Sequence, residues 1–177
     1  FTVTTGGPSP CDENVITENT VWEDVVSGDA IDYVIDCEIS VQNDALLTIE
    51  PGVIIAFEGN LAGIFTSDGG GLNAVGTQAD PIVFRGTSDS KGIWTGVYFG
   101  SDHPENRLEH VMVMHAGRSA SGQSGETGAV QLSRSGESEA AIVECTIVNN
   151  AGYGLFITDK CALRAFSNNI ITNNSDA

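Results

Sequence analysis

The chain has 177 residues, enough for one domain or for one segment of a longer repeat protein. Its 24 acidic and 7 basic residues give a formal net charge of −17, which excludes nucleic acid and anionic lipid surfaces as partners because binding them requires Lys and Arg. No stretch approaches the roughly 18 apolar residues of a membrane span, so we expect no membrane insertion. The 21 glycines favour turns and short strands over a helical bundle.

The first 30 residues match none of the repeats found further along the chain. We therefore expect residues 1–30 to form a cap over the N-terminal end of a repeat structure that fills residues 31–177, because uncovered strand edges invite aggregation. Cys11 and Cys37 flank this segment, and none of the four cysteines has the C-x-x-C spacing of a zinc or redox site. A bridge between Cys11 and Cys37 would pin the cap and contribute roughly 3 kcal/mol.

Short apolar runs between turn signals predict the first strands after the cap. The runs are Leu46–Ile49, Val53–Phe57 and Pro81–Phe84. Pro51-Gly52 supplies a tight turn between the first two, with Gly free to adopt positive φ. We expect Trp22 and Trp94 to fill the core rather than to stack on sugars.

Similar residues return along the second half of the chain, which indicates internal repeats. The segment 143–150 aligns with 167–174 at a spacing of 24, so that Ile147 meets Ile171 and the Asn pairs coincide. The segment 109–115 fits the same alignment at a spacing of 34, and the Ser- and Gly-rich loop 118–127 contains the additional residues. A second strand type recurs at Gly96–Phe99, Gly128–Leu132 and Gly154–Ile157.

Repeats of 20 to 35 residues with short β-runs and no helical periodicity predict an all-β solenoid, a right-handed parallel β-helix. Each rung would stack about 4.8 Å above the previous one, so like residues form columns. The register around Val111 stays open by one residue, and one slip exchanges the inner and outer faces. The residues expected to point inward are Ile49, Ile55, Phe57, Val83, Val97, Phe99, Val111, Val113, Val130, Leu132, Cys145, Ile147, Leu155, Ile157, Leu163 and Ile171.

Asn149 and Asn173 would occupy equivalent rung ends, where Asn tolerates the left-handed conformation and donates its amide to the next rung. We interpret this ladder as structural. His115 would occupy the same column one rung earlier and serve as a turn residue as well.

The motif order resembles the parallel β-helix regions of large secreted bacterial surface proteins, within the pectate-lyase-like fold superfamily. The opening run Leu47–Phe57 carries the pattern L-T-I-x-P-G-V-x-I-x-F, and similar motifs continue to residue 177. The resemblance specifies fold rather than function, because such repeats encode turns and core. Relatives in the wider fold include pectate lyases, polygalacturonase-like hydrolases and adhesins. We expect the C-terminal end to be open or truncated, with further rungs or a partner following.

Residues that could support catalysis are scattered along the sequence. A lyase needs a base beside a neutralised carboxylate, and a hydrolase needs two carboxylates across a sugar bond. The arginines show no cluster near a histidine, and His103, His110 and His115 lack metal-ligand spacing. His110 and Glu144 would stack on adjacent rungs as a surface pair. The carboxylates considered were Asp89, Asp102, Glu105, Glu109 and Glu144. We assign no catalytic residue.

Calcium is the one cofactor that the acidic composition suggests, because Ca²⁺ prefers carboxylate and backbone oxygens. The candidate ligands are Asp68 among glycines and the pair Asp12 and Glu13, although Asp68 also suits a simple turn. A second bridge, Cys145 to Cys161, is an alternative to two small buried residues at these positions. Either bridge would indicate an oxidising, extracytoplasmic compartment.

Two functions remain open at this point. The first is a non-catalytic extracellular module, a rigid spacer or an adhesion surface that recognises a glycan or another surface protein along an outer face or the loop 118–127. The second is a carbohydrate-active enzyme, a polysaccharide lyase or glycoside hydrolase, with its active site on loops or in further rungs. The expected disulfides and the resemblance imply a secreted or cell-surface location.

Overall fold

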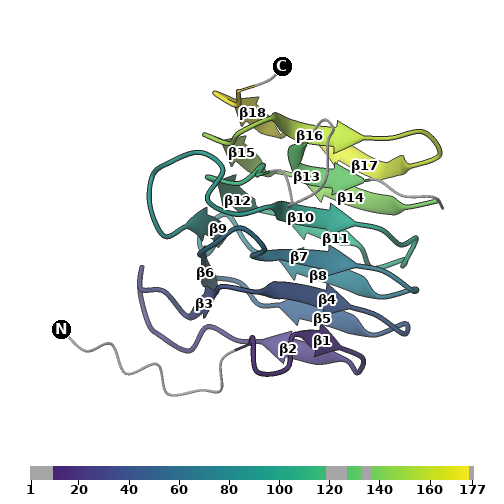
Figure 1. Ribbon diagram of the computed structural model, residues 1–177, viewed down its shortest axis with the longest axis horizontal. Coiled ribbons are helices and arrows are strands. Elements are labelled where there is room, and N and C mark those ends of the chain that lie inside the picture. The colour runs from purple at the N-terminus through teal and green to yellow at the C-terminus, as the bar shows by residue number, and fades with distance from the viewer. Residues whose placement is uncertain (1–9, 119–126, 133–136, 176–177) are drawn as a thin grey trace.

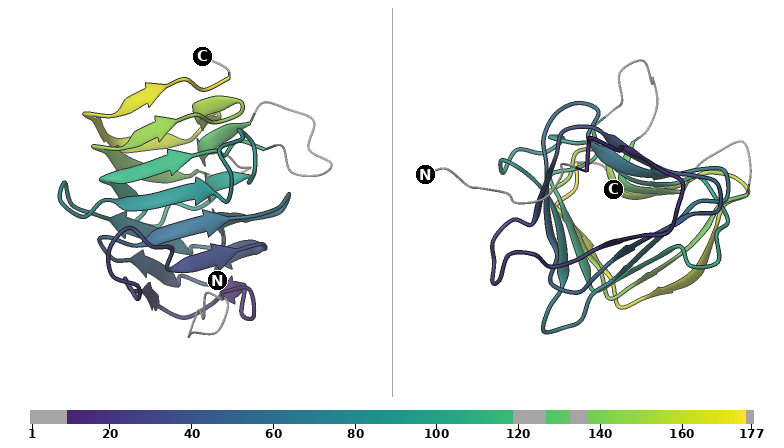
Figure 2. Two further views of the ribbon diagram at one scale, coloured as in Figure 1. Left: turned by 90° about the vertical axis from the view of Figure 1, so that its left-hand side faces the viewer. Right: turned by 90° about the horizontal axis from the view of Figure 1, so that it is seen from below.

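In its described residues the protein is a parallel β-helix built from three six-stranded parallel sheets, without any helix (Figure 1). The computed structural model describes residues 10–118, 127–132 and 137–175. The chain passes through the three sheets in turn, so every third strand belongs to the same sheet. Seen from below in Figure 2, the sheets enclose a three-sided interior. Among the described residues no helix is long and apolar enough to cross a membrane.

Six rungs of three strands each account for the eighteen strands found in the described part of the chain. Sheet A contains β1 (Val15–Ile16), β4 (Glu38–Val41), β7 (Gly63–Thr66), β10 (Gly96–Phe99), β13 (Gly128–Leu132) and β16 (Tyr153–Ile157). Sheet B contains β2 (Thr20–Trp22), β5 (Leu46–Ile49), β8 (Gly71–Val75), β11 (Arg107–Glu109), β14 (Glu139–Val143) and β17 (Ala162–Ser167). Sheet C contains β3 (Tyr33–Ile35), β6 (Ile54–Phe57), β9 (Ile82–Gly86), β12 (Val111–Met114), β15 (Thr146–Val148) and β18 (Ile170–Thr172).

The strand register confirms both predicted repeat spacings. Ile147 pairs with Ile171 at 24 residues, and Val113 pairs with Ile147 at 34. In sheet A, Val97 pairs with Val130 and Val130 with Leu155, as the second strand type predicts. Loops that differ in length between rungs therefore leave the columns aligned.

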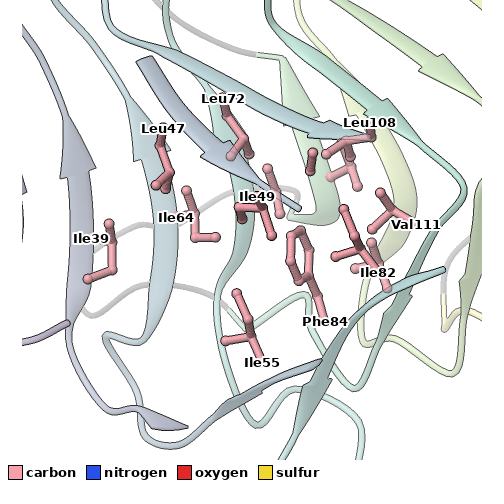
Figure 3. Packing of buried hydrophobic residues seen from close by; sticks show 14 of the residues in the cluster. Ile39, Leu47, Ile49, Ile55, Ile64, Leu72, Ile82, Phe84, Leu108 and Val111 are labelled. Atoms are coloured by element: carbon pink, nitrogen blue, oxygen red, sulfur yellow. The ribbon is translucent and has the colours of Figure 1, made fainter. Parts of the chain in front are cut away.

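The core is a continuous apolar column that the stacked rungs share. Ile55, Phe84, Val113 and Ile147 succeed one another in sheet C, and each is fully buried. Figure 3 shows side chains from neighbouring rungs, Leu47 and Leu72 among them, pointing into this interior. Since no rung could bury its inner face alone, stacking supplies most of the burial.

One predicted inward residue was wrong. Val83 lies on the outer face of sheet C and is partly exposed, whereas Ile82 and Phe84 on either side of it are buried. Because three successive residues of this strand are apolar, the sequence alone does not show which of them point inward. In the structure Phe84 pairs with the buried Ile55, so Phe84 points inward and Val83 outward. In the last described rung Ile157 and Ile171 continue the inner columns but remain 39% and 40% exposed, because no described strand covers them.

The first rung begins earlier than expected. Strands β1 and β2 pair in parallel with β4 and β5, and Trp22 aligns with Ile49. The predicted boundary at residue 30 therefore falls inside the first rung, because these two- and three-residue strands are too short to show a repeat. The predicted disulfide joins Cys11 to Cys37 and ties the segment before β1 to the turn before β4.

Polar ladders at the corners confirm the structural role of asparagine. Asn149 and Asn173 lie at positive φ, and the Asn173 amide donates to the Asn149 side-chain oxygen. The buried member of the ladder is the next residue: Asn150 Oδ1 accepts from the Ala116 N–H at 2.8 Å, and its Nδ2 donates to the Val113 carbonyl. These amides satisfy backbone groups that the corner would otherwise leave unpaired inside the protein.

Candidate ligand-binding cleft

A cleft of about 350 Å³ lies on the outer face of sheet A, across β4, β7, β10 and β13. It is open to solvent along one side of the stack, where consecutive rungs present one outward side chain each. Its lining consists of Glu38, Ser40, Gln42, Phe65, Thr66, Ser67, Thr95, Gly96, Tyr98, Arg118, Thr127 and Gln131.

An aromatic pair forms the centre of the cleft. Phe65 and Tyr98 occupy the same register position on β7 and β10 and point outward, where both are partly exposed. Their rings stack with centroids 5.6 Å apart and planes at 27°. The column continues with Ser40 on one side and Gln131 on the other. The result is an apolar platform whose two ends are polar.

Two glycines allow neighbouring groups to pack closely beside this platform. Gly63 and Gly96 pair with each other two register positions before Phe65 and Tyr98. A Cβ on Gly63 would lie 2.1 Å from Thr95 Oγ1, and Gly96 has a φ of 127°, which disfavours other residues. Of the two, Gly96 lines the cleft, and it contributes backbone atoms there.

Charge in the cleft comes from one carboxylate and one guanidinium among the described lining residues, Glu38 and Arg118. Arg118 is exposed and donates from Nη1 to the Gly92 carbonyl at 3.2 Å, while its backbone N–H donates to Trp94 O. Glu38 is the first residue of strand β4 in the second rung, whereas Arg118 lies between β12 and β13. The cleft therefore offers charged groups of both signs at its rim, and neutral hydrogen-bonding groups between them.

The residues predicted as calcium ligands do not gather. The cluster of metal-ligating types found among the described residues is Cys11, Asp36 and Cys37, whose two sulfurs already form the disulfide. Asp68 lies at a φ of 47° in the turn between β7 and β8, and its carbonyl accepts the Asp44 N–H at 3.2 Å. That geometry matches the turn interpretation of Asp68. Asp12 and Glu13 lie exposed before β1.

The predicted alternative bridge between Cys145 and Cys161 was wrong. Cys145 lies at the corner between sheets B and C, and Cys161 at the corner between sheets A and B, so a whole strand of sheet B separates them. Cys145 is buried in the core, and desolvation raises the pKa of its thiol to about 11. Ser138 Oγ donates to the Cys161 sulfur at 3.1 Å. Both residues serve packing at their corners.

The three histidines lie apart from the cleft lining. His110 stacks beside Glu144 with Nδ1 and a carboxylate oxygen 3.8 Å apart, as predicted from adjacent rungs. His115 lies at a φ of 64° in the column of Asn149, which confirms its place in the turn. It is buried, and desolvation lowers its pKa. His103 Nδ1 accepts the backbone N–H of Glu105.

The carboxylates considered for catalysis are likewise dispersed. Glu109 pairs with Arg107 on the outer face of sheet B, and Glu144 accepts from the Asn168 amide. None of Asp89, Asp102, Glu105, Glu109 and Glu144 is among the described residues that line the cleft. Residues 119–126 of the loop expected to contact a ligand lie outside the described residues, but its ends, Arg118 and Thr127, line the cleft.

Sequence reasoning placed the tryptophans correctly and missed the aromatic platform. Trp94 is fully buried and stacks on Phe57 with ring centroids 3.9 Å apart, and Trp22 stacks on Tyr33. Phe65 and Tyr98 were not identified. The signal was available in two aligned strands that each place an aromatic residue two positions after glycine, Gly63–Thr66 and Gly96–Phe99.

Comparison with known proteins gives one family match. The model of the pectate-lyase-like beta helix domain matches residues 17–154, which is more than half of the chain. Neither a curated protein nor a solved structure matches. The matched range begins before β2 and ends within β16, so it includes all four strands that form the cleft.

Proposed function

We propose that this chain, which belongs to the pectate-lyase-like β-helix family, is a non-catalytic extracellular module. It would bind a neutral glycan chain in the cleft over sheet A. The stacked pair Phe65 and Tyr98, exposed between polar side chains, is the observation that carries this proposal. Aromatic faces bind the apolar C–H faces of sugar rings, and flanking amides and hydroxyls bind their hydroxyl groups.

The shape of the cleft supports a chain that runs along the stack axis. The column Ser40, Phe65, Tyr98 and Gln131 presents one side chain for each rung, so successive sugar units would meet successive rungs. Gln131 is held by a bond from Nε2 to the Gly128 carbonyl at 3.0 Å, and Gln42 by one to Ser40 Oγ. These bonds fix the polar groups before a ligand arrives, which lowers the entropy lost on binding.

Charge favours neutral over acidic polymers. The chain carries −17, and Arg118 is the one cationic side chain among the described cleft residues. The net negative charge of the chain would repel a polyuronate unless cations bridged the two. The Cys11–Cys37 disulfide supports an extracytoplasmic location, because such bridges persist in oxidising compartments.

A carbohydrate-active enzyme is the second candidate, favoured by the presence of Arg118 and Glu38 in the same cleft. Arginine can act as the base of a lyase when a neighbouring group neutralises the substrate carboxylate. Hydrolysis of a glycosidic bond needs two carboxylates, and the described lining supplies one of them, Glu38. Turnover assays on neutral polymers and polygalacturonate, followed as new reducing ends and as unsaturated products, separate the two candidates. Chain cleavage would overturn the non-catalytic proposal.

The binding prediction concerns Phe65→Ala and Tyr98→Ala. Each variant is expected to weaken binding to a neutral β-linked glucan or xylan at least about tenfold, because removing one ring leaves half of the stacking platform. Isothermal titration of the intact chain measures this loss. Phe166→Ala, which removes an aromatic side chain that is 50% exposed on sheet B, is the matched control and should bind normally. Binding of the unmodified chain to none of the neutral polymers, or equal binding by all variants, would contradict the proposal.

A further inference from the structure

A second pair of stacked aromatic rings lies on sheet A, in the rung that follows the cleft. Tyr153 and Phe156 belong to β16, and their ring centroids are 5.7 Å apart with planes at 22°. Both side chains are partly exposed, and β16 itself consists of uncharged residues. The pair is therefore a neutral aromatic platform of the same kind as Phe65 and Tyr98.

The strand register places this second platform in line with the cleft. Gln131 pairs with Tyr98 on one side and with Phe156 on the other. Val130 and Leu132, which flank Gln131, are buried in the core, so Gln131 and the residue paired with it point outward. The outward column of the cleft thus continues to Phe156, one rung beyond Gln131. In Figure 1 the strands β7, β10, β13 and β16 lie one above another along the stack.

Backbone contacts join the second platform to the cleft lining. The Tyr153 N–H donates to the Thr127 carbonyl at 2.8 Å, and Thr127 lines the cleft. A Cβ on Gly128 would lie 2.9 Å from the Cβ of Phe156, so glycine at this position leaves room for the aromatic side chain. The second platform therefore adjoins the end of the cleft that Thr127 and Gln131 form.

We infer that Tyr153 and Phe156 form a further subsite for the same glycan chain, an inference that rests on the proposed function. Phe65 and Phe156 lie three rungs apart, a distance of about 14 Å at about 4.8 Å for each rung. With one sugar unit for each rung, a chain of about four units is the shortest that reaches both platforms. Gln131 lies between the platforms, where its amide can bind the hydroxyl groups of the intervening unit.

The length of the glycan chain then determines its affinity. A short chain contacts one platform only. A chain that spans both platforms makes the second contact without a further loss of translational freedom, so its affinity exceeds that of either contact alone. The ligand class is therefore an extended neutral oligosaccharide or polysaccharide rather than a monosaccharide or disaccharide.

Isothermal titration of the intact chain with neutral β-linked gluco- and xylo-oligosaccharides of about two to six units tests the inference. We expect the affinity to rise at least about tenfold once the oligosaccharide has about four units. Phe156→Ala should abolish this rise and leave the affinity for the shortest oligosaccharides unchanged. Phe156→Tyr should retain the rise, because it keeps the aromatic ring.

Phe166→Ala is the matched control, since it removes a 50% exposed aromatic side chain from the same rung on sheet B. This variant should bind oligosaccharides of every length like the unmodified chain. Far-UV circular dichroism and thermal melting establish that the variants fold. An equal loss of affinity in Phe156→Ala and Phe166→Ala would overturn the inference, because it would assign the effect to the last rung as a whole.

The same titrations distinguish failure of the second subsite from failure of the proposed function. If Phe65→Ala weakens binding while Phe156→Ala binds the longest oligosaccharides as tightly as the unmodified chain, the cleft binds glycan and the second platform does not. An affinity that is independent of oligosaccharide length would likewise overturn the second subsite alone. If the unmodified chain binds no neutral oligosaccharide of any length, both proposals are wrong.

Discussion

Replacing Trp94 with alanine is expected to lower the free energy of unfolding by about 3–5 kcal/mol, the cost of removing a fully buried large aromatic side chain. The Trp94 ring is fully buried, stacks on Phe57 at 3.9 Å between centroids, and donates from Nε1 to the Met114 carbonyl at 2.9 Å. The substitution therefore opens a cavity and also removes the hydrogen bond to the Met114 carbonyl. Chemical denaturation of the variant and of the unmodified chain measures the difference.

Phe65→Ala is the matched control for this prediction. Phe65 is also aromatic and lies in a central rung, but its ring points outward and is partly exposed. Its removal should cost about 1 kcal/mol or less, because it leaves no internal cavity. If the two variants lost similar stability, the assignment of inward and outward columns would be wrong.

Loss of the Cys11–Cys37 disulfide is expected to lower the free energy of unfolding by about 3.5 kcal/mol, from the entropy of closing a loop of this length in the unfolded chain. The bridge spans 26 residues and ties the segment before β1 to the turn before β4. Denaturation with and without a reductant measures the loss. In the double variant Cys11→Ser with Cys37→Ser, the reductant should change nothing. If the reductant lowered the free energy of unfolding of the double variant as much as that of the unmodified chain, the result would contradict the prediction.

The middle and last rungs could be predicted from the sequence because side chains at equivalent positions in successive rungs have the same structural role. Ile147 and Ile171 fill the same inner column, and Asn149 and Asn173 the same left-handed corner. Those requirements are local, so they leave a repeated pattern even where loop length varies between rungs.

Two predictions, the start of the first rung and the orientation of Val83, were wrong because the local sequence pattern gave too little information. Strands β1 and β2 contain only two and three residues, too few to show alternation. In β9, Ile82, Val83 and Phe84 are all apolar, so alternation could not distinguish core from surface. Apolar residues on both faces of a strand hide its register.

The cleft could be predicted only in part. The aromatic residues Phe65 and Tyr98 are visible in the sequence, but their proximity depends on a register that joins residues 33 positions apart. The bridge between Cys145 and Cys161 failed for a related reason. Their separation of 16 residues places them at different corners of the coil, whereas paired residues in one column of this half of the chain are 23 to 34 apart.

The most direct test of the stacked coil is a pair of engineered cysteines on neighbouring rungs. Thr48 on β5 pairs directly with Asn73 on β8, and both point outward from sheet B. Adjacent parallel strands lie about 4.8 Å apart, within the range that a disulfide can span. Thr48→Cys with Asn73→Cys should therefore cross-link under mild oxidation, measured as the loss of two thiols in the intact mass and in alkylation. Thr48→Cys with Ala74→Cys should not, because Ala74 points into the core. Cross-linking of both pairs, or of neither, would contradict the stacked-rung architecture.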